Sequence, residues 1–294
     1  MRMNLPQRSH RDARLQRADA VARDIARCAV RSLHAELILY PKPGLVSRRD
    51  NGAHRDMNAT TFVRSLFALR RYFADVARAG ARGASMAELR RLGVAAEGRM
   101  LHATGGVNTH RGAIFTLGLL AAAAAYVNME GRTACTDAML RDTIARRWRR
   151  DLIAVAAPDT GALSHGQQMA ARYGAAGARG EAMRGFPAVF DVALPALRDA
   201  LARGVDAQRA GVHALFALLA VVEDTNVLYR GGATALADAR HGAAAFLARG
   251  SVFVPDWLEH AEALHRHCSR SRVSPGGCAD LLAAAWFVHR LQAR

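Results

Sequence analysis

Lysine is almost missing from this sequence. Of the 41 lysine and arginine residues only Lys42 is a lysine, so 41 − 1 = 40 are arginine. Aromatic residues make up only 6% of the chain, which disfavours a β-sandwich because strands are enriched in aromatic and β-branched residues. The cysteines form no CxxC pair, which excludes the usual zinc and disulfide signatures. We expect reduced, mostly buried thiols in a cytoplasmic protein.

Long, strongly apolar segments and the common nucleotide motifs are also missing. The longest uncharged run, residues 112–129, is rich in alanine. It falls short of the ~20 strongly apolar residues that span a bilayer, so we expect a buried core helix and no membrane partner. The N-terminal segment lacks the apolar core of a secretory signal. The chain has no GxxxxGKS/T loop, no GxGxxG after a strand and no GxSxG motif.

What the chain does have is alanine and positive charge. Hydrophobic residues make up 51% of the sequence, and many are alanine, the strongest helix former. We therefore predict an all-α fold, with a disordered basic tail over residues 1–12 and one compact multi-helix domain over residues 13–294. The apolar spacing predicts a first helix from about Asp12 to Leu39 and later helices over 206–229 and 233–249.

Two helix starts can be assigned to capping residues. Asn58 or Thr60 precedes an apolar stripe and could cap the second helix, and Ser85 could cap the third. Side chains of this kind accept hydrogen bonds from the first free backbone amides of a helix.

The net charge of +16 favours anionic partners such as nucleotides, nucleic acid or an acidic protein. However, the arginines are spread along the whole chain, and no basic block alternates with aromatic residues as in a single-strand-binding platform. We expect no nucleic acid partner, and a basic helical nucleic-acid-binding protein is the alternative hypothesis.

Five loops between the predicted helices share one composition, in which glycine stands beside arginine, histidine, asparagine, aspartate or lysine. Glycine lets the backbone approach a ligand closely, and free amides at helix N-termini attract phosphate. The loops could therefore converge on one polyphosphate site. They are YPKPGLVSRRDNGAHRDM (40–57), TGGVNTHRG (104–112), YGAAGARGEAMRGFP (173–187), EDTNVLYRGG (223–232) and SPGGCADLL (274–282).

Each loop also has a structural interpretation. The prolines of PKPG could simply end a helix, and Asn108 or Thr109 could be an N-cap. The glycine pair that follows Arg230 is a plausible helix C-cap. Asp224 and Asn226 are harder to explain in this way, because VVEDTNVL embeds polar groups in an apolar helical run.

Taken together, the ordered motifs resemble those of the triphosphoribosyl-dephospho-CoA synthases. The resemblance runs from about residue 20 to residue 290. Each motif alone is weak, whereas five in the same order at sensible spacing make a strong match. The segments that carry it are PKPGLV with NGAHRDM, GVNTHRGAIF, YGAAGARGEAMRGFP, DTNVLYRGG and SPGGCADLLA.

The resemblance implies a glycosyl transfer from ATP to the 2′-hydroxyl of 3′-dephospho-CoA, with release of adenine and with Mg²⁺ as the companion of ATP. The product is the precursor of the prosthetic group on an acyl carrier subunit. Breaking the C–N glycosidic bond implies an oxocarbenium-like transition state. Such a reaction needs a base for the hydroxyl, a donor to adenine and charge compensation for the triphosphate.

The motif residues can supply these groups. We expect Glu181 or Asp56 as the general base and Asp224 and Asp56 as Mg²⁺ ligands, with the division between these roles left open. For Asp50 and Asp280 we favour a structural role. The residues expected to hold phosphates are Lys42, Arg111, Arg179 and Arg230, and those expected to bind the rest of the substrates are His54, Asn108, His110 and Asn226.

The single lysine is expected to have a particular role. Lysine is a compact point charge on a thin stem, whereas arginine is a wide planar fork. The prolines on either side of Lys42 restrict the backbone and should direct the stem. We predict that Lys42 reaches into the triphosphate site, where a guanidinium would not fit.

Partners follow from the same resemblance. The family serves either malonate decarboxylase or citrate lyase, and Tyr40 and Ser47 in YPKPGLVS favour the malonate decarboxylase branch. A downstream holo-acyl carrier protein transferase or the acyl carrier subunit could bind the chain, which could also form a homodimer. Recruitment to an acidic carrier subunit through the positive charge is a third hypothesis, compatible with the enzyme.

Overall fold

The computed structural model describes residues 5–131, 135–154 and 165–293. Within these ranges every regular element is a helix, which confirms the predicted all-α fold. The α-helices are α1 (Leu5–Ile38), α2 (Ala59–Ala81), α3 (Met86–Thr104), α4 (Arg111–Met129), α5 (Asp137–Ala154), α6 (His165–Tyr173), α7 (Gly177–Met183), α8 (Leu194–Ala202), α9 (Ala207–Val221), α10 (Thr225–Ala248), α11 (Trp257–Arg270) and α12 (Gly276–Gln292). A π-helix, η1 (Ala188–Ala193), precedes α8, and a short 3₁₀-helix, η2 (Ser251–Phe253), precedes α11.

Helix α4 is the centre of the core, with α1, α2, α3, α5, α7 and α12 packed against it. Its alanine-rich segment, Ala121–Ala125, is completely buried. The helix is long and apolar enough to cross a membrane, yet most of it is covered by other helices, as predicted for the run 112–129. Because alanine has little bulk, neighbouring helix axes can approach α4 closely.

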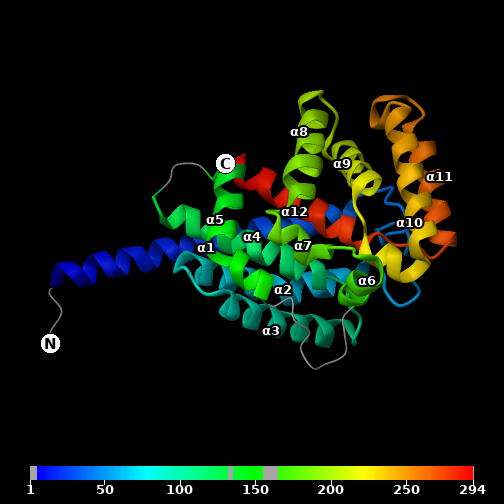
Figure 1. Cartoon of the computed structure of the whole chain (residues 1–294). Coiled ribbons are helices and arrows are strands. Elements are labelled where there is room, and N and C mark those ends of the chain that lie inside the picture. Colours follow the sequence, from blue (N-terminus) through cyan, green and yellow to red (C-terminus); the bar gives the residue numbers. More distant parts are fainter. Residues whose placement is uncertain (1–4, 132–134, 155–164, 294) are drawn as a thin grey trace.

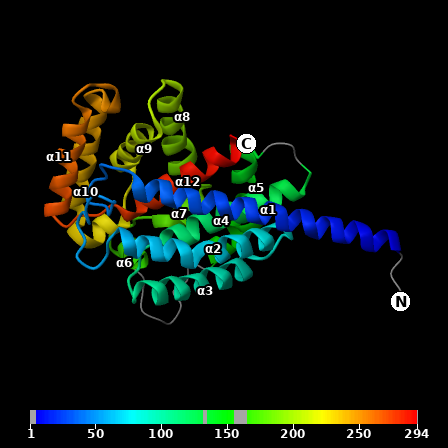
Figure 2. The same cartoon turned by 180° about the vertical axis from the view of Figure 1, so that it is seen from behind.

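Helix α1 lies along α2 and α12, and its N-terminal part projects beyond the body of the protein (Figure 1). At its other end the chain enters the loop 39–58. In both views this loop lies beside the paired helices α10 and α11 (Figure 2). A second, smaller apolar cluster joins α6, α10 and α11 there and includes Val227, Cys268 and Val273.

The two predicted capping sites are confirmed. Asn58 is the N-cap of α2, where it forms a capping box with Thr61. Ser85 is the N-cap of α3, and its hydroxyl accepts a hydrogen bond from the amide of Glu88. These short side chains satisfy amides that have no partner inside the helix.

The boundaries of two predicted helices were wrong. The first helix begins at Leu5 instead of near Asp12, and the disordered tail over residues 1–12 stays a prediction. The helix predicted over 206–229 is interrupted after Val221, because the Asp224 side chain caps a new helix that starts at Thr225. Gly232, with φ 71°, then breaks α10 where the sequence placed a glycine C-cap.

The contact between α2 and α4 gives a test of this packing. A Cβ atom added to Gly80 would lie 2.2 Å from the carbonyl oxygen of Ala122, whereas one added to Gly98 on α3 would meet no atom within 4 Å. We expect Gly80→Ala to lower the free energy of unfolding by ~1–3 kcal/mol through overpacking. Gly98→Ala should leave it unchanged or raise it by up to ~1 kcal/mol. Urea denaturation measures both, and equal effects would contradict the packing described here.

Candidate active site

Four of the five glycine-rich loops meet at one cavity of about 380 Å³ between the ends of α1, α2, α4, α10 and α12. The loops 40–57, 104–112, 223–232 and 274–282 all contribute to its wall. The predicted site residues that line it are His54, Asp56, Asn108, His110, Arg111, Asn226 and Arg230. The predicted residues that lie outside its wall are Lys42, Arg179, Glu181 and Asp224.

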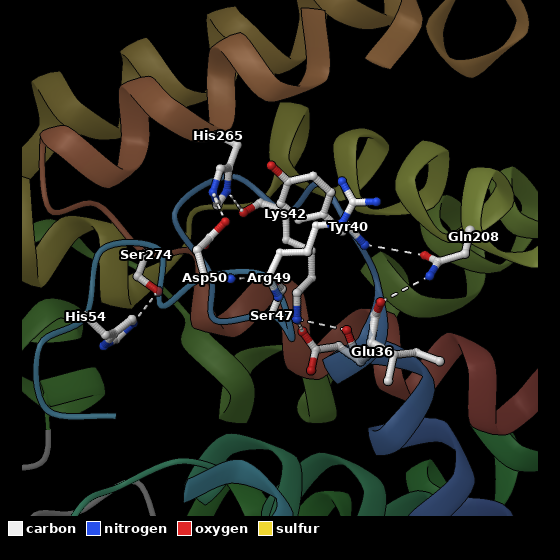
Figure 3. Close-up of polar contacts among 11 residues, drawn as sticks. Glu36, Tyr40, Lys42, Ser47, Arg49, Asp50, His54, Gln208, His265 and Ser274 are labelled. Atoms are coloured by element: carbon white, nitrogen blue, oxygen red, sulfur yellow. Dashed lines mark hydrogen bonds and ion pairs between the residues drawn. The ribbon is translucent and has the colours of Figure 1, made fainter. Parts of the chain in front are cut away.

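The loop 40–57 is fixed by contacts with α11 and with the segment that follows it (Figure 3). Gly44 has φ 65°, and a Cβ atom there would lie 1.9 Å from the carbonyl oxygen of Val273. Nδ1 of His265 donates to the carbonyl oxygen of Lys42 at 2.5 Å, and its Nε2 lies 3.2 Å from the Asp50 carboxylate. Asp50 thus has the structural role that the sequence favoured, and the loop is held at a fixed place on the cavity wall.

Lys42 is completely buried, with 1% of its surface exposed. Its ammonium donates to Oε1 of Glu36 at 2.6 Å and to the Glu36 carbonyl oxygen at 2.8 Å (Figure 3). Burial lowers the pKa of Lys42, and the charge of Glu36 opposes that shift. The partner carboxylate lines the cavity, whereas the lysine does not. The predicted contact between Lys42 and phosphate stays a prediction, and its observed role is to hold Glu36.

Glu36 is a site residue that the sequence analysis missed. It follows Leu33 by three residues on the helix α1, so a carboxylate interrupts the apolar stripe formed by Leu33 and Leu37. Only 4% of Glu36 is exposed. A buried carboxylate is expensive unless it is paired, so this interruption of the stripe was a signal that a partner had to exist.

His110 places a neutral imidazole at the cavity. Its Nδ1 lies 2.7 Å from the hydroxyl of Ser65, and only 3% of the residue is exposed. Burial, helped by the charge of Lys42, lowers the pKa of His110 to about 3. Its Nε2 and the hydroxyl of Thr109 have no hydrogen-bond partner among the described residues, and both residues line the cavity. Two residues of the wall thus carry buried polar atoms without a hydrogen-bond partner among the described residues.

A second cluster of polar side chains lies at the cavity wall around His54. Its Nε2 lies 2.8 Å from the hydroxyl of Ser274, and the Arg230 guanidinium lies 3.3 Å from its Nδ1. Burial and the charge of Arg230 lower the pKa of His54. The Asp56 carboxylate, 58% exposed, is 3.5 Å from the same Nδ1. Residues from three of the loops are thus in direct contact here.

Asp224 holds two helices together and lies behind the cavity. Its Oδ1 accepts from the amides of Asn226 at 2.8 Å and Val227 at 3.3 Å, so it caps α10. Its Oδ2 accepts from the amide of Cys278 at 2.8 Å, in the first turn of α12. Both oxygens are engaged by backbone amides, which explains why polar residues interrupt the apolar run. The Mg²⁺ role stays a prediction that this geometry does not support.

The fifth loop, 173–187, does not line the cavity, contrary to the expectation that all five loops converge. It folds into α7, which packs against α4, α5 and α6. Glu181 binds the amide of Ala188 at 3.0 Å and the Arg184 guanidinium at 3.1 Å. These bonds hold the turn that leads into η1. The roles predicted for Glu181 and Arg179 in catalysis and phosphate binding stay predictions.

Asp280, for which the sequence favoured a structural role, lines the cavity. Its carboxylate accepts a hydrogen bond from the backbone amide of Ala113, at the start of α4. A Cβ atom on Gly112 would lie 2.0 Å from Oδ2 of Asp280, so only glycine permits this approach. Burial and the negative charges of Glu36 and Asp224 raise the pKa of Asp280 well above its usual range.

Comparison with known proteins agrees with the family resemblance found in the sequence motifs. Residues 22–294 match the family model described as ATP:dephospho-CoA triphosphoribosyl transferase. The chain is 35% identical over 290 residues to a probable 2-(5″-triphosphoribosyl)-3′-dephosphocoenzyme-A synthase of Acinetobacter calcoaceticus, with 95% of this chain and 97% of the other covered. It is 40% identical over 280 residues to a probable synthase of the same name from Pseudomonas putida, covering 92% and 95%. For the synthase of Pectobacterium atrosepticum the identity is 39% over 272 residues, covering 90% and 88%. No solved structure matches.

The Lys42–Glu36 pair should be worth much more to folding than an exposed ion pair. Lys42→Met leaves a buried carboxylate without its partner, so we expect the free energy of unfolding to fall by ~3–5 kcal/mol. The double variant Lys42→Met/Glu36→Gln should lose clearly less than the sum of the single changes. Arg146→Met removes an exposed pair with Asp142 and should cost under ~1 kcal/mol. Urea denaturation at pH 7 measures the wild type and the four variants, Glu36→Gln included, and a loss below ~1 kcal/mol for Lys42→Met would contradict the buried pair.

His110 should make stability depend on pH. The unfolded histidine takes up a proton below pH ~6.5, whereas the folded pKa is about 3. The stability contributed by neutral His110 is therefore present above pH ~6.5 and is lost as the pH falls, by ~1.4 kcal/mol per pH unit. The free energy of unfolding of the wild type, measured by denaturant between pH 7 and 5, should fall with this slope. In His110→Asn the slope should be smaller by ~1.4 kcal/mol per pH unit. The exposed His102→Asn serves as the control, and an unchanged slope in His110→Asn would rule the assignment out.

Proposed function

The chain belongs to the ATP:dephospho-CoA triphosphoribosyl transferase family, and on this premise we propose that the cavity of about 380 Å³ is its active site. The enzyme forms 2′-(5″-triphosphoribosyl)-3′-dephospho-CoA, a prosthetic-group precursor, from ATP and dephospho-CoA. The observation that carries the proposal is the meeting of four polar, glycine-rich loops at one cavity. Its volume is at the small end of the ~300–1,000 Å³ usual for ligand sites. The reacting ribose groups therefore lie inside, and the remaining parts of both nucleotides extend over the rim.

Arg111 and Arg230 are the cations that fit the triphosphate. Both line the cavity and come from different loops. Arg111 uses its Nε to bind Glu97 at 3.0 Å, and Arg230 uses one Nη to approach His54, so each retains other N–H groups for phosphate oxygens. Charge-assisted bonds of this kind are the strong ones in phosphate recognition.

Asp56 is the residue we propose to hold Mg²⁺ with ATP. Mg²⁺ is usually bound through one or two carboxylates together with phosphate oxygens and water. Asp56 suits this role because its carboxylate is largely exposed at the cavity and lies close to Arg230 through their shared neighbour His54. Bound Mg²⁺ would neutralise part of the triphosphate charge.

The neutral polar residues suit the sugar and the adenine. Asn108 and Asn226 line the cavity, and their amides can donate and accept at once. His110 belongs to the same wall, and its buried Nε2 has no partner among the described residues. We propose that these groups orient the ribose and hydrogen-bond the departing adenine. Because His110 is neutral, it stabilises the leaving group as a hydrogen-bond partner without adding a positive charge.

We propose that the protein belongs to the malonate decarboxylase branch because of the sequence of its first loop, where Tyr40 and Ser47 occupy positions that often differ in the citrate lyase branch. The carrier subunit, its transferase or a second copy of the chain are further proposed partners, in the cytoplasm. Nucleic acid binding is not favoured, because many of the arginines are paired with carboxylates, as in Arg78–Asp19 and Arg198–Asp137.

The activity is tested by incubating the protein with ATP, Mg²⁺ and dephospho-CoA. Free adenine should appear in a 1:1 ratio with a heavier CoA derivative, both quantified by chromatography with mass spectrometry. Arg230→Gln should raise KM for ATP by ~10-fold or more through the loss of a charge-assisted bond worth ~1.5–3 kcal/mol. The exposed Arg71→Gln on α2 should behave as the wild type.

Omitting single components separates this reaction from others. Adenine released without dephospho-CoA would identify an ATP-cleaving hydrolase. A folded protein that releases no adenine under any of these conditions would refute the proposal.

A further inference from the structure

Among the described residues, the carboxylates in the cavity wall belong to Glu36, Asp56 and Asp280. A proton acceptor for the substrate hydroxyl must be one of these three if it comes from this part of the wall. Glu36 binds the Lys42 ammonium at 2.6 Å, so a proton on it would break a buried ion pair. Asp56 is 58% exposed, and the Mg²⁺ that we propose it holds would occupy the carboxylate oxygen that a proton needs. Asp280 has neither disadvantage.

Asp280 is held in place with acceptor capacity to spare. It lies just after the first turn of α12, and the amide of Ala113 in the first turn of α4 donates to it. An ionised carboxylate has about four lone-pair sites on its two oxygens. The one bond to Ala113 orients the Asp280 carboxylate. It leaves the other lone pairs of that carboxylate for a ligand in the cavity that Asp280 lines.

The surroundings of Asp280 also increase its basicity. Burial and the charges of Glu36 and Asp224 raise its pKa. The charged and titratable groups that face this region are Glu36 on α1, Lys42 in the following loop, His110 at the start of α4, Asp224 at the start of α10 and Cys278 on α12. A base gains strength as its pKa approaches the working pH.

We propose that Asp280 is the general base that removes the proton from the 2′-hydroxyl of dephospho-CoA, a role that rests on the proposed function. As the proton moves to Asp280, the hydroxyl oxygen forms a bond with C1′ of the ATP ribose. The bond between C1′ and N9 of adenine breaks, and its electron pair leaves with adenine. The departing adenine then takes up the proton that Asp280 has received, which restores the carboxylate and balances the reaction without any further acid or base.

The competing explanation is structural, since Asp280 also supplies an acceptor to the N-terminus of α4, whose N-cap His110 makes no capping bond. Two substitutions separate the explanations. Asp280→Asn retains an oxygen that can accept from Ala113 but cannot act as a base. Asp280→Ala removes both functions. Asp238→Asn, at an exposed position of α10, is the matched control.

We expect Asp280→Asn to unfold at the wild-type temperature and to bind ATP and dephospho-CoA with wild-type Kd, while kcat for adenine release falls by about 10²–10⁴-fold. Formate added to Asp280→Ala should restore part of the activity by acting as an external base. Asp238→Asn should have wild-type kcat. Near-normal kcat in a folded Asp280→Asn would overturn the proposal and leave only the helix-capping role.

A measurement on the wild type keeps the test independent of whether the variants fold. kcat should fall on the acid side with a slope of one and a midpoint above the ~3.9 of an ordinary aspartate. A kcat that does not change from pH 5 to 8, without rescue by formate, would also overturn the proposal. Absence of adenine release from the wild type would instead refute the proposed function, so the two failures are distinguishable.

Discussion

A single buried carboxylate determines where the starts of α10 and α12 meet. Asp224 accepts amides from α10 with one oxygen and from α12 with the other. Because the contact is so close, Gly277 has no room for a side chain: a Cβ atom there would lie 2.9 Å from Oδ2 of Asp224. Asn226 and Arg230 follow on α10, and Asp280 follows on α12. The positions of these cavity residues all depend on that carboxylate.

The cavity wall also concentrates charge that water cannot screen. Lys42 compensates Glu36, whereas Asp280 and Asp224 rely on backbone amides for their stabilisation. In such a medium each charge influences the others over longer distances than in water. Lys42 lowers the pKa of His110 while Glu36 raises that of Asp280. The ion pair, His110 and Asp280 are therefore one electrostatic unit, although they come from separate segments of the chain.

Much of the fold could be predicted from sequence because its signals are local. Alanine content, apolar spacing and the capping residues Asn58 and Ser85 act within one or two turns, and these predictions were confirmed. The composition of the loops also identified most of the cavity wall. What could not be predicted depends on distant contacts. The approach of Asp280 to Gly112 joins residues far apart in the sequence. Glu36 and Lys42 are only six residues apart, but their pairing depends on how the loop folds after the end of α1. The loop 173–187 had the right composition but packs elsewhere.

The order in which the chain is synthesised gives the arrangement of the cavity a further meaning. Its wall begins at Leu33 on the first helix and is completed by Asp280 on the last. Until α12 emerges and docks, the amides of α4 and the carboxylate of Asp224 lack partners from that helix, and the cavity lacks one side. An incomplete chain on the ribosome therefore lacks the finished cavity, which forms only when the last helix has closed the core.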